Sequence, residues 1–187
     1  QRDVVGLDVA AGGMNRQNMW GKAVKSLKTL VSLSALAVCM GAASMANAYS
    51  ITPVNSNFTA PGTISVKSPS SYQATVNCTA NFTGNVDATG VAKITGVTVS
   101  GSGLCALPKI TGLPWTLTAT GPAAGSVANV GYTIASSVLY PASNCGPSTI
   151  TVGYSGGVLT AANQGLSGSC TVVSLSVTPS PTFTIVP

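Results

Sequence analysis

The feature that most constrains the fold of this chain is a repeated alternation of apolar and polar residues. From Tyr49 onward, short runs rich in Val, Ile and Thr are separated by turn residues, and none shows capped helical periodicity. Such runs are typical of strands that bury one face. Residues 91–100, for example, place Ile94, Val97 and Val99 on one face, with a break at Gly96. The sequence therefore predicts an all-β fold.

The spacing of these runs predicts how the strands are organised. The expected strands are residues 64–67, 72–82, 91–100, 115–119, 127–135, 149–154, 158–161, 171–177 and 182–186. Residues 87–90 and 155–157 read as hairpin loops between strands. About nine short strands indicate a single β-sandwich or a closed barrel over residues 64–187, with Trp115 as a core or disulfide-packing aromatic. Residues 49–63 contain two prolines and are expected to form an extended N-terminal arm.

The scarcity of charge excludes several classes of function. Charged residues make up 6% of the chain, which has no histidine, against about 25% in a typical domain. From residue 49 onward they are Lys67, Asp87, Lys93 and Lys109. Nucleic-acid binding depends on many Lys and Arg contacts to phosphates, so it is excluded. Acid–base catalysis lacks its usual residues, and Asp87 fits a turn better than a metal site. We expect no enzyme, no catalytic residue, no metal and no cofactor.

The N-terminal region has the pattern of an export signal. Lys25 and Lys28 precede the apolar run 30–40, and small residues follow up to Ala46 and Ala48. Basic, apolar and A-x-A segments in this order predict a secretory signal peptide that is cut after Ala48. The apolar run is too short to cross a membrane, so the mature form is expected to have no membrane span. We expect a secreted, extracellular protein at the cell surface or in the matrix.

The start of the leader is a separate expectation. A GTG start codon read in frame would appear as Val24, which predicts a signal peptide over residues 24–48. Residues 1–23 would then be translated upstream sequence or an artefactual extension. A lipoprotein site at Cys39 is the alternative, although Val38 stands where a small residue is expected.

The remaining cysteines indicate disulfides. Removal of Cys39 with the leader leaves Cys78, Cys105, Cys145 and Cys170. An even number of cysteines in an exported chain predicts two disulfides, and four cysteines allow three connectivities. The short separations favour pairing Cys78 with Cys105 and Cys145 with Cys170, and the other pairings stay open. A zinc site would need closely spaced cysteine pairs, which the sequence lacks.

Strand edges without charge suggest self-assembly. Soluble monomers usually protect their sheet edges with charged side chains, especially lysine, yet residues 149–154 and 171–177 carry no charge. We therefore expect a homopolymer, a filament or surface layer, with Ile51, Val54 and Phe58 of the arm as the candidate linking strand. The alternative is a monomer in which loops, prolines or barrel closure hide the edges.

Several segments also resemble a known family. These are residues 25–30 and 34–41 of the leader and residues 49–55, 112–117 and 144–149. They resemble the Pra-type alkane-oxidation activator proteins of Gram-negative bacteria. The resemblance implies a small secreted protein that aids growth on long-chain alkanes, and it supplies no catalytic residues. It favours an alternative function, a surface-active accessory protein whose partner is a hydrocarbon surface. Such a protein would need an exposed apolar patch.

Overall fold

The structure, a computed structural model, describes residues 48–187. The extension predicted at residues 1–23, most of the leader, Cys39 and Ala46 lie outside the described residues. Of the predicted cleavage site, only Ala48 is described, and it is exposed.

The described chain is built from strands joined by short connections and two 3-10 turns. The elements are β1 (Ser50–Thr52), β2 (Ser56–Lys67), η1 (Pro69–Ser71), β3 (Val76–Val86), β4 (Ala92–Ser100), η2 (Gly103–Ala106), β5 (Lys109–Thr111), β6 (Trp115–Gly121), β7 (Ala124–Ile134), β8 (Ser143–Ser155), β9 (Val158–Leu166), β10 (Cys170–Val177) and β11 (Thr184–Val186).

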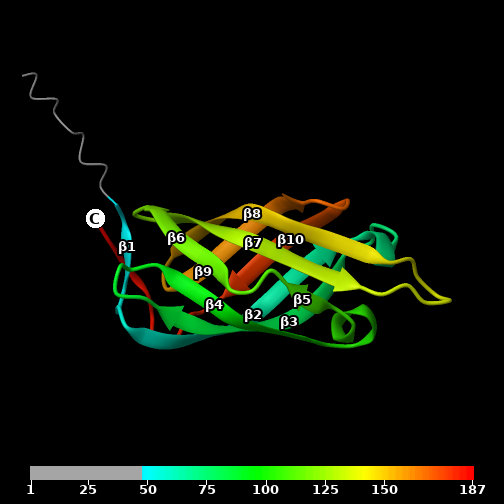
Figure 1. Cartoon of the computed structure of the whole chain (residues 1–187), viewed down its shortest axis with the longest axis horizontal. Helices are drawn as coiled ribbons and strands as arrows, with labels where there is room; N and C mark the ends of the chain where they lie inside the picture. The colour runs from blue at the N-terminus through cyan, green and yellow to red at the C-terminus, as the bar shows by residue number, and fades with distance from the viewer. Residues whose placement is uncertain (1–47) are drawn as a thin grey trace, which may run out of the picture. The chain divides into compact units, whose positions relative to one another are not determined.

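Eight of these strands close into a barrel (Figure 1). Around the ring the order is β2-β3-β4-β6-β7-β8-β9-β10, and β10 pairs back with β2. Each strand is antiparallel to its neighbours and, apart from the closing pair and the pair β4–β6, which β5 separates in the chain, directly follows its neighbour in sequence. This is an up-and-down barrel, whose closure removes the edges of an open sheet. The prediction of an all-β sandwich or closed barrel is confirmed, in its barrel form.

Three short strands lie outside the ring. The first half of β7 pairs with β6 and its second half with β5, so β5 and β6 occupy successive stretches of one edge of β7. The strands β1 and β11 pair only with each other. Their Ile51 and Ile185 lie opposite one another in register.

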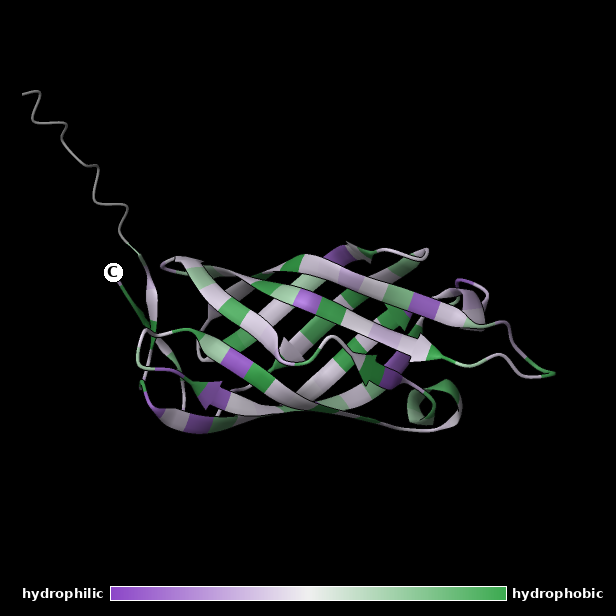
Figure 2. Cartoon of the chain, viewed as in Figure 1, coloured by the Kyte–Doolittle hydropathy of each residue, from purple (hydrophilic) through white to green (hydrophobic). Residues whose placement is uncertain are grey.

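The barrel interior holds the hydrophobic core. Successive side chains of a strand point to opposite faces, and in Figure 2 apolar and polar residues alternate along the ring strands. The inward residues form one buried cluster with members from all eight ring strands. Trp115 belongs to this cluster, and its indole N–H donates to the Thr111 carbonyl at 2.7 Å, which confirms its prediction as a core aromatic.

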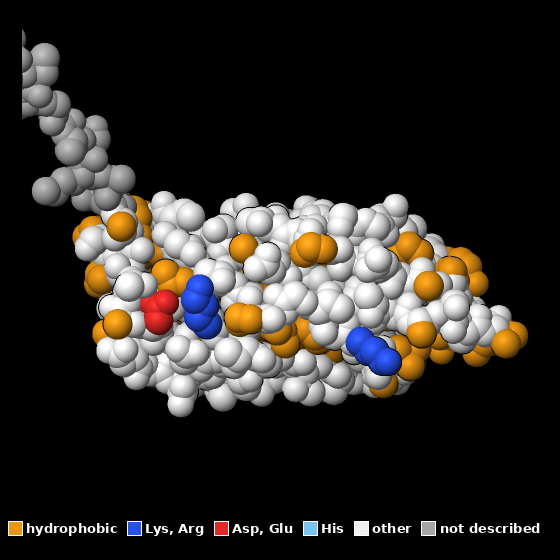
Figure 3. Space-filling model, viewed as in Figure 1, with side chains coloured by type: hydrophobic (Ala, Val, Ile, Leu, Met, Phe, Trp, Pro, Cys, Tyr) orange, Lys and Arg blue, Asp and Glu red, His pale blue; other side chains and the backbone are white. Residues whose placement is uncertain are grey.

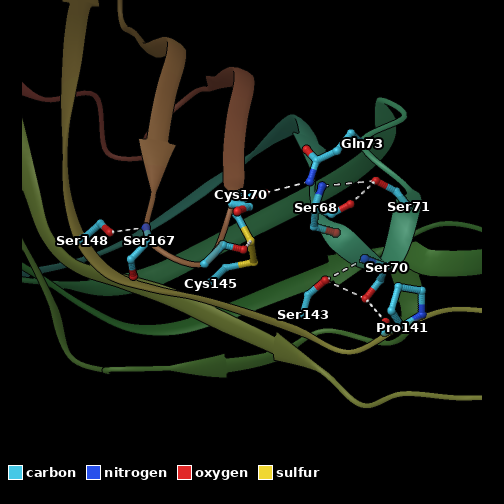
Figure 4. Close-up of a disulfide and its surroundings, with 12 residues drawn as sticks. Ser68, Ser70, Ser71, Gln73, Pro141, Ser143, Cys145, Ser148, Ser167 and Cys170 are labelled. Carbon is cyan, nitrogen blue, oxygen red and sulfur yellow. Dashed lines mark hydrogen bonds between the residues drawn. A yellow bond between two sulfur atoms is a disulfide. The ribbon is translucent and has the colours of Figure 1, made fainter.

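Different elements close the two ends of the barrel. At one end Ile51 of β1 is buried, and the Phe183 ring meets the Phe58 ring edge-on at 5.1 Å. At the other end η1 lies beside the start of β8, with Ser70 and Ser71 buried (Figure 4). The Ser70 amide donates to the Ser143 hydroxyl at 2.9 Å, and the two serine hydroxyls lie 2.6 Å apart. These buried polar groups are paired, as burial requires.

Two disulfides fasten the barrel. Cys78 pairs with Cys105, which ties β3 to η2, and Cys145 pairs with Cys170, which ties β8 to β10. The predicted pair of disulfides is therefore confirmed, with the connectivity that short separations favour. The second disulfide lies beside η1 (Figure 4).

Most strand boundaries differ from those predicted; β8, for example, begins at Ser143 and β9 ends at Leu166. The strand predicted at residues 72–82 begins at Val76, because the Tyr72 amide donates to the Pro69 carbonyl and Tyr72 adopts left-handed backbone angles. The boundary predicted after residue 63 falls inside β2. That strand pairs with β3 from Ser56 to Val66 and belongs to the barrel wall.

Candidate functional site

The three residues predicted to link copies of the chain lie in different environments. Ile51 and Phe58 are 2% and 4% exposed and pack inside their own molecule. Val54, in the turn between β1 and β2, is 41% exposed. The structure therefore does not bring them together as one exposed strand.

The charged residues do not form a reactive cluster. Asp87 accepts hydrogen bonds at one carboxylate oxygen from the Thr89 amide, the Thr89 hydroxyl and the Val91 amide. The Thr89 hydroxyl bond is the main cause that lowers the pKa of Asp87. This is the arrangement of a turn residue. Within residues 48–187 no His, Cys, Asp and Glu side chains group as metal ligands. The same residues include no helix long and apolar enough to cross a membrane.

One concave feature is an apolar cavity inside the barrel. It has a volume of about 90 Å³ and is lined by residues of all eight ring strands, among them Phe82, Trp115 and Leu175. For comparison, a cavity of about 150 Å³ lined by Leu, Ile and Phe binds benzene. The interior therefore has room for part of a small apolar molecule beside its own side chains.

The barrel wall is interrupted on one flank. The strand β4 pairs with β6 only from Ala92 to Ile94. Thr95 is then an extra residue opposite β3, because Thr83 faces Gly96 and Gly84 faces Ile94. Such a β-bulge bends a strand and shifts its alternation. Beyond the bulge β4 has no partner among the described strands on the side away from β3, and β5 lies there unpaired with it.

Several cavity-lining residues beside this interruption are partly exposed, as are Ile64, Val66 and Val76 of β2 and β3. The lining residues of β4 and β5 next to it, Val97, Val99 and Ile110, are only half-buried, as are Leu104 of η2 and Pro108. We call these five residues the flank opening. Figure 3 shows apolar side chains reaching the surface along the middle of the barrel. Apolar surface left wet in a concave site is a common property of ligand pockets.

One polar group inside the cavity is unsatisfied. Tyr132 of β7 lines the cavity and is 8% exposed. Its neighbour across the strand pair is Ile110 of β5, which also lines the cavity. The Tyr132 hydroxyl has no hydrogen-bond partner among the described residues. Burial raises the pKa of the Tyr132 phenol, and the Ser68 side chain opposes this shift as a nearby polar group, although its placement does not meet the geometry of a hydrogen bond to Tyr132. A buried hydroxyl without a partner costs about 1–3 kcal/mol.

A second apolar feature projects from the end of the barrel that carries η1. In the loop between β7 and β8, Val138 is fully exposed and Leu139 is 72% exposed, as is the neighbouring Tyr72. We call Tyr72, Val138 and Leu139 the apolar tip. Figures 1 and 3 show this loop extending beyond the strands, with apolar side chains at its end.

The apolar tip is held in place by hydrogen bonds. The Ser137 hydroxyl accepts from the Leu139 amide at 3.1 Å, and the Ser137 amide donates to the Tyr140 carbonyl at 2.9 Å. The Tyr72 hydroxyl donates to the Leu139 carbonyl at 3.2 Å. The loop is thus folded as a turn that presents its apolar side chains to solvent. Their exposure is a property of this geometry.

Sequence reasoning missed the apolar tip and the unsatisfied hydroxyl of Tyr132. Val138 and Leu139 stand between two predicted strands, next to Ser136, Ser137 and Pro141. Apolar residues in a loop composition are the signal that could have marked the tip. Nothing in the sequence distinguishes Tyr132 from a tyrosine with a satisfied hydroxyl.

The fold and its surfaces define a disulfide-fastened up-and-down β-barrel with an apolar interior and an apolar tip. The chain belongs to the PraA/PraB-like family of alkane oxidation protein activators, which it matches over residues 24–187. This confirms the resemblance found in the sequence. The family description names an activator and not an enzyme. No curated protein and no solved structure matches the chain.

Proposed function

We propose that this protein is a secreted, non-enzymatic accessory protein of alkane utilisation that attaches to hydrocarbon surfaces through its apolar tip. The observation that carries this proposal is the fully exposed Val138 beside Leu139 on a turn fixed by hydrogen bonds. Membership of a family of alkane oxidation activators supports hydrocarbon as the partner.

The expected strength of attachment follows from the size of the tip. Burying a Val or Leu side chain in an apolar phase contributes about 1.5–3 kcal/mol. Val138 and Leu139 together would contribute roughly 3–6 kcal/mol. A single copy is therefore expected to bind a droplet reversibly, much as one acyl chain gives only marginal membrane binding. The four charged residues beyond residue 48 add little repulsion from an oil surface.

Action outside the cell is part of the same proposal. Two disulfides are typical of proteins that work in oxidising compartments, and both pairs are formed in this structure. The signal peptide expected at residues 24–48 supports export.

The test is the interfacial tension between n-hexadecane and water, measured on a pendant drop with the full chain. The wild type is expected to lower the tension, and the double variant Val138→Ser/Leu139→Ser to lower it much less. The matched control is Ala135→Ser/Ala142→Ser, which adds two hydroxyls at exposed positions of the same loop and is expected to behave as wild type. Equal activity of the wild type and the Val138/Leu139 variant would remove the tip from the function.

Self-assembly into filaments or a surface layer is the second candidate. Closure of the barrel pairs the uncharged run 171–177 of β10 on both sides, with β2 and with β9. The uncharged run 149–154 of β8 pairs with β7, but it pairs with β9 only from Gly153 onward. One observation still favours assembly: β4 beyond Ile94 and the facing edge of β5 have no strand partner in the described chain. A strand of a second copy would have to pair there.

A further inference from the structure

We propose that the barrel interior binds a neutral long-chain alcohol, with the alcohol hydroxyl at Tyr132 and the alkyl chain leaving through the flank opening. This inference rests on the proposed function, because it takes hydrocarbon chemistry as the setting, and it names a ligand for a different part of the molecule from the tip. Three observations support it: the cavity, its unsatisfied polar group and its opening.

The polar group decides against a plain alkane. Tyr132 is more than nine-tenths buried, and its hydroxyl makes no hydrogen bond of acceptable geometry in the described chain, although the Ser68 side chain lies near it in the cavity lining. An alkane would leave this hydroxyl unpaired and dry. A ligand with one terminal oxygen would pair it, and one neutral hydrogen bond contributes about 1 kcal/mol.

The absence of charge decides against a fatty acid. None of Lys67, Lys93 and Lys109 lines the cavity. A carboxylate buried without a cation or several donors pays a large desolvation cost. A hydroxyl, which both donates and accepts one hydrogen bond, matches a phenol in an apolar site.

The volume of the cavity determines how much of the ligand's alkyl chain can lie inside the barrel. By the scale on which about 150 Å³ holds benzene, the cavity of about 90 Å³ holds roughly four carbon atoms. The remaining carbons must lie elsewhere, and the half-buried Val97, Val99 and Ile110 of the flank opening continue the apolar lining outward. Tyr132 is separated from this opening only by β5, since it pairs with Ile110. An alcohol that enters with its hydroxyl first therefore meets apolar side chains along the length of its alkyl group.

Such a ligand fits a place in a reaction sequence. A terminal alcohol is the product expected when an oxygen atom is inserted into the end carbon of an alkane. An enzyme of that reaction class would supply the ligand, and this chain would hold it without changing it.

The test compares three ligands of equal chain length with the full-length protein. Binding of 1-octanol and octanoate is measured by calorimetric titration, and binding of n-octane by headspace partition. The wild type is expected to bind 1-octanol more tightly than either of the others. Tyr132→Phe keeps the ring and removes the hydroxyl, so 1-octanol affinity is expected to fall about five-fold, the effect of one neutral hydrogen bond, with n-octane affinity unchanged.

A second pair of variants tests the opening. Val99→Lys places a charge among the lining residues and is expected to lower 1-octanol affinity by about ten-fold or more, because the ammonium must stay hydrated where the chain would lie. Thr98→Lys is the matched control, since Thr98 is the exposed neighbour on the same strand, and it is expected to bind as wild type.

The outcomes separate this inference from the proposed function. Loss of interfacial activity in the tip variant together with no 1-octanol binding overturns the inference and leaves the function standing. Specific 1-octanol binding together with an unchanged tip variant overturns the role of the tip and supports the ligand. Equal affinity of Tyr132→Phe and wild type for 1-octanol overturns the assignment of the hydroxyl.

Discussion

A single charged side chain, Asp87, holds the loop between β3 and β4 together. Asp87 is the one acidic residue after residue 48, and its carboxylate oxygen gathers three hydrogen bonds across the β3–β4 loop. Hydrogen bonds to an ionised carboxylate favour the charged form, and they lower the pKa of Asp87 below its usual value of 3.8.

The pKa of Asp87 yields a prediction about pH. Because the folded pKa is lowered, the ionised carboxylate stabilises the fold fully above the unfolded pKa, and this contribution is lost as the pH falls through the folded pKa. Asp87→Ala is therefore expected to lower the melting temperature at pH 7. The gap to wild type should shrink below about pH 3.8. Thermal melts followed by circular dichroism from pH 7 to pH 2 measure this gap.

The control for Asp87 is Asp87→Asn, whose amide oxygen can accept hydrogen bonds but does not ionise. Its melting temperature should lie between those of wild type and Asp87→Ala at pH 7. Its difference from Asp87→Ala should stay constant with pH. A pH-independent gap between wild type and Asp87→Ala would contradict the assigned role of the charge.

Among the elements, β4 shows what the sequence can and cannot predict. The inward set Ile94, Val97 and Val99 and its break at Gly96 are readable from period-two alternation, and the structure turns that break into the bulge at Thr95. The loss of pairing with β6 beyond Ile94 is not readable, because strand partners depend on the closure of the whole ring. Tyr72 continues the alternation of β3, yet the hydrogen bonds of η1 override that pattern.

The disulfides are expected to stabilise the fold equally but to act on different elements. Their sequence separations are 27 and 25 residues, so the chain-entropy relation gives about 3.5 kcal/mol for each. Cys78→Ala/Cys105→Ala and Cys145→Ala/Cys170→Ala should each lower the free energy of unfolding by about this amount, measured by urea denaturation.

Amide hydrogen exchange separates the two disulfides. Loss of Cys78–Cys105 releases η2, which carries Leu104 of the flank opening, so exchange in residues 103–106 should accelerate. Loss of Cys145–Cys170 should leave exchange at η2 unchanged and serves as the control. Equal acceleration of η2 in both variants would show that the opening does not depend on its own disulfide.

For the whole molecule, closure of the ring changes the expectation for assembly. The pairing of β2 with β10 closes the ring, and the unpaired strand edges of the described chain lie beside the flank opening, between β8 and β9 before Gly153, and at β1 and β11. Assembly through the flank would predict species that grow with concentration in sedimentation velocity. Thr98→Lys, which places a lysine beside the free edge of β4, should return them to monomer. A single monomeric species of wild type at every concentration would exclude self-assembly.

At the scale of the whole molecule, closure of the ring is the feature that the sequence does not predict. Alternation in β8 and β10 predicts strands with one buried face, but it is the same in a sandwich and in a barrel. The choice depends on Thr171 of β10 meeting Lys67 of β2, a contact between distant parts of the chain. The unsatisfied hydroxyl of Tyr132 likewise results from how the closed ring packs around it.

The position of the flank opening has a consequence for how this barrel can diversify. The aperture is bordered by the connection 101–114, which carries η2 and β5 and contributes no strand to the ring. Insertions and deletions in that connection can widen or narrow the aperture while every ring strand keeps its neighbours. If the interior holds an alkyl chain as proposed, selectivity for chain size can therefore change in relatives that keep Cys105 and the pairing of β5 with β7.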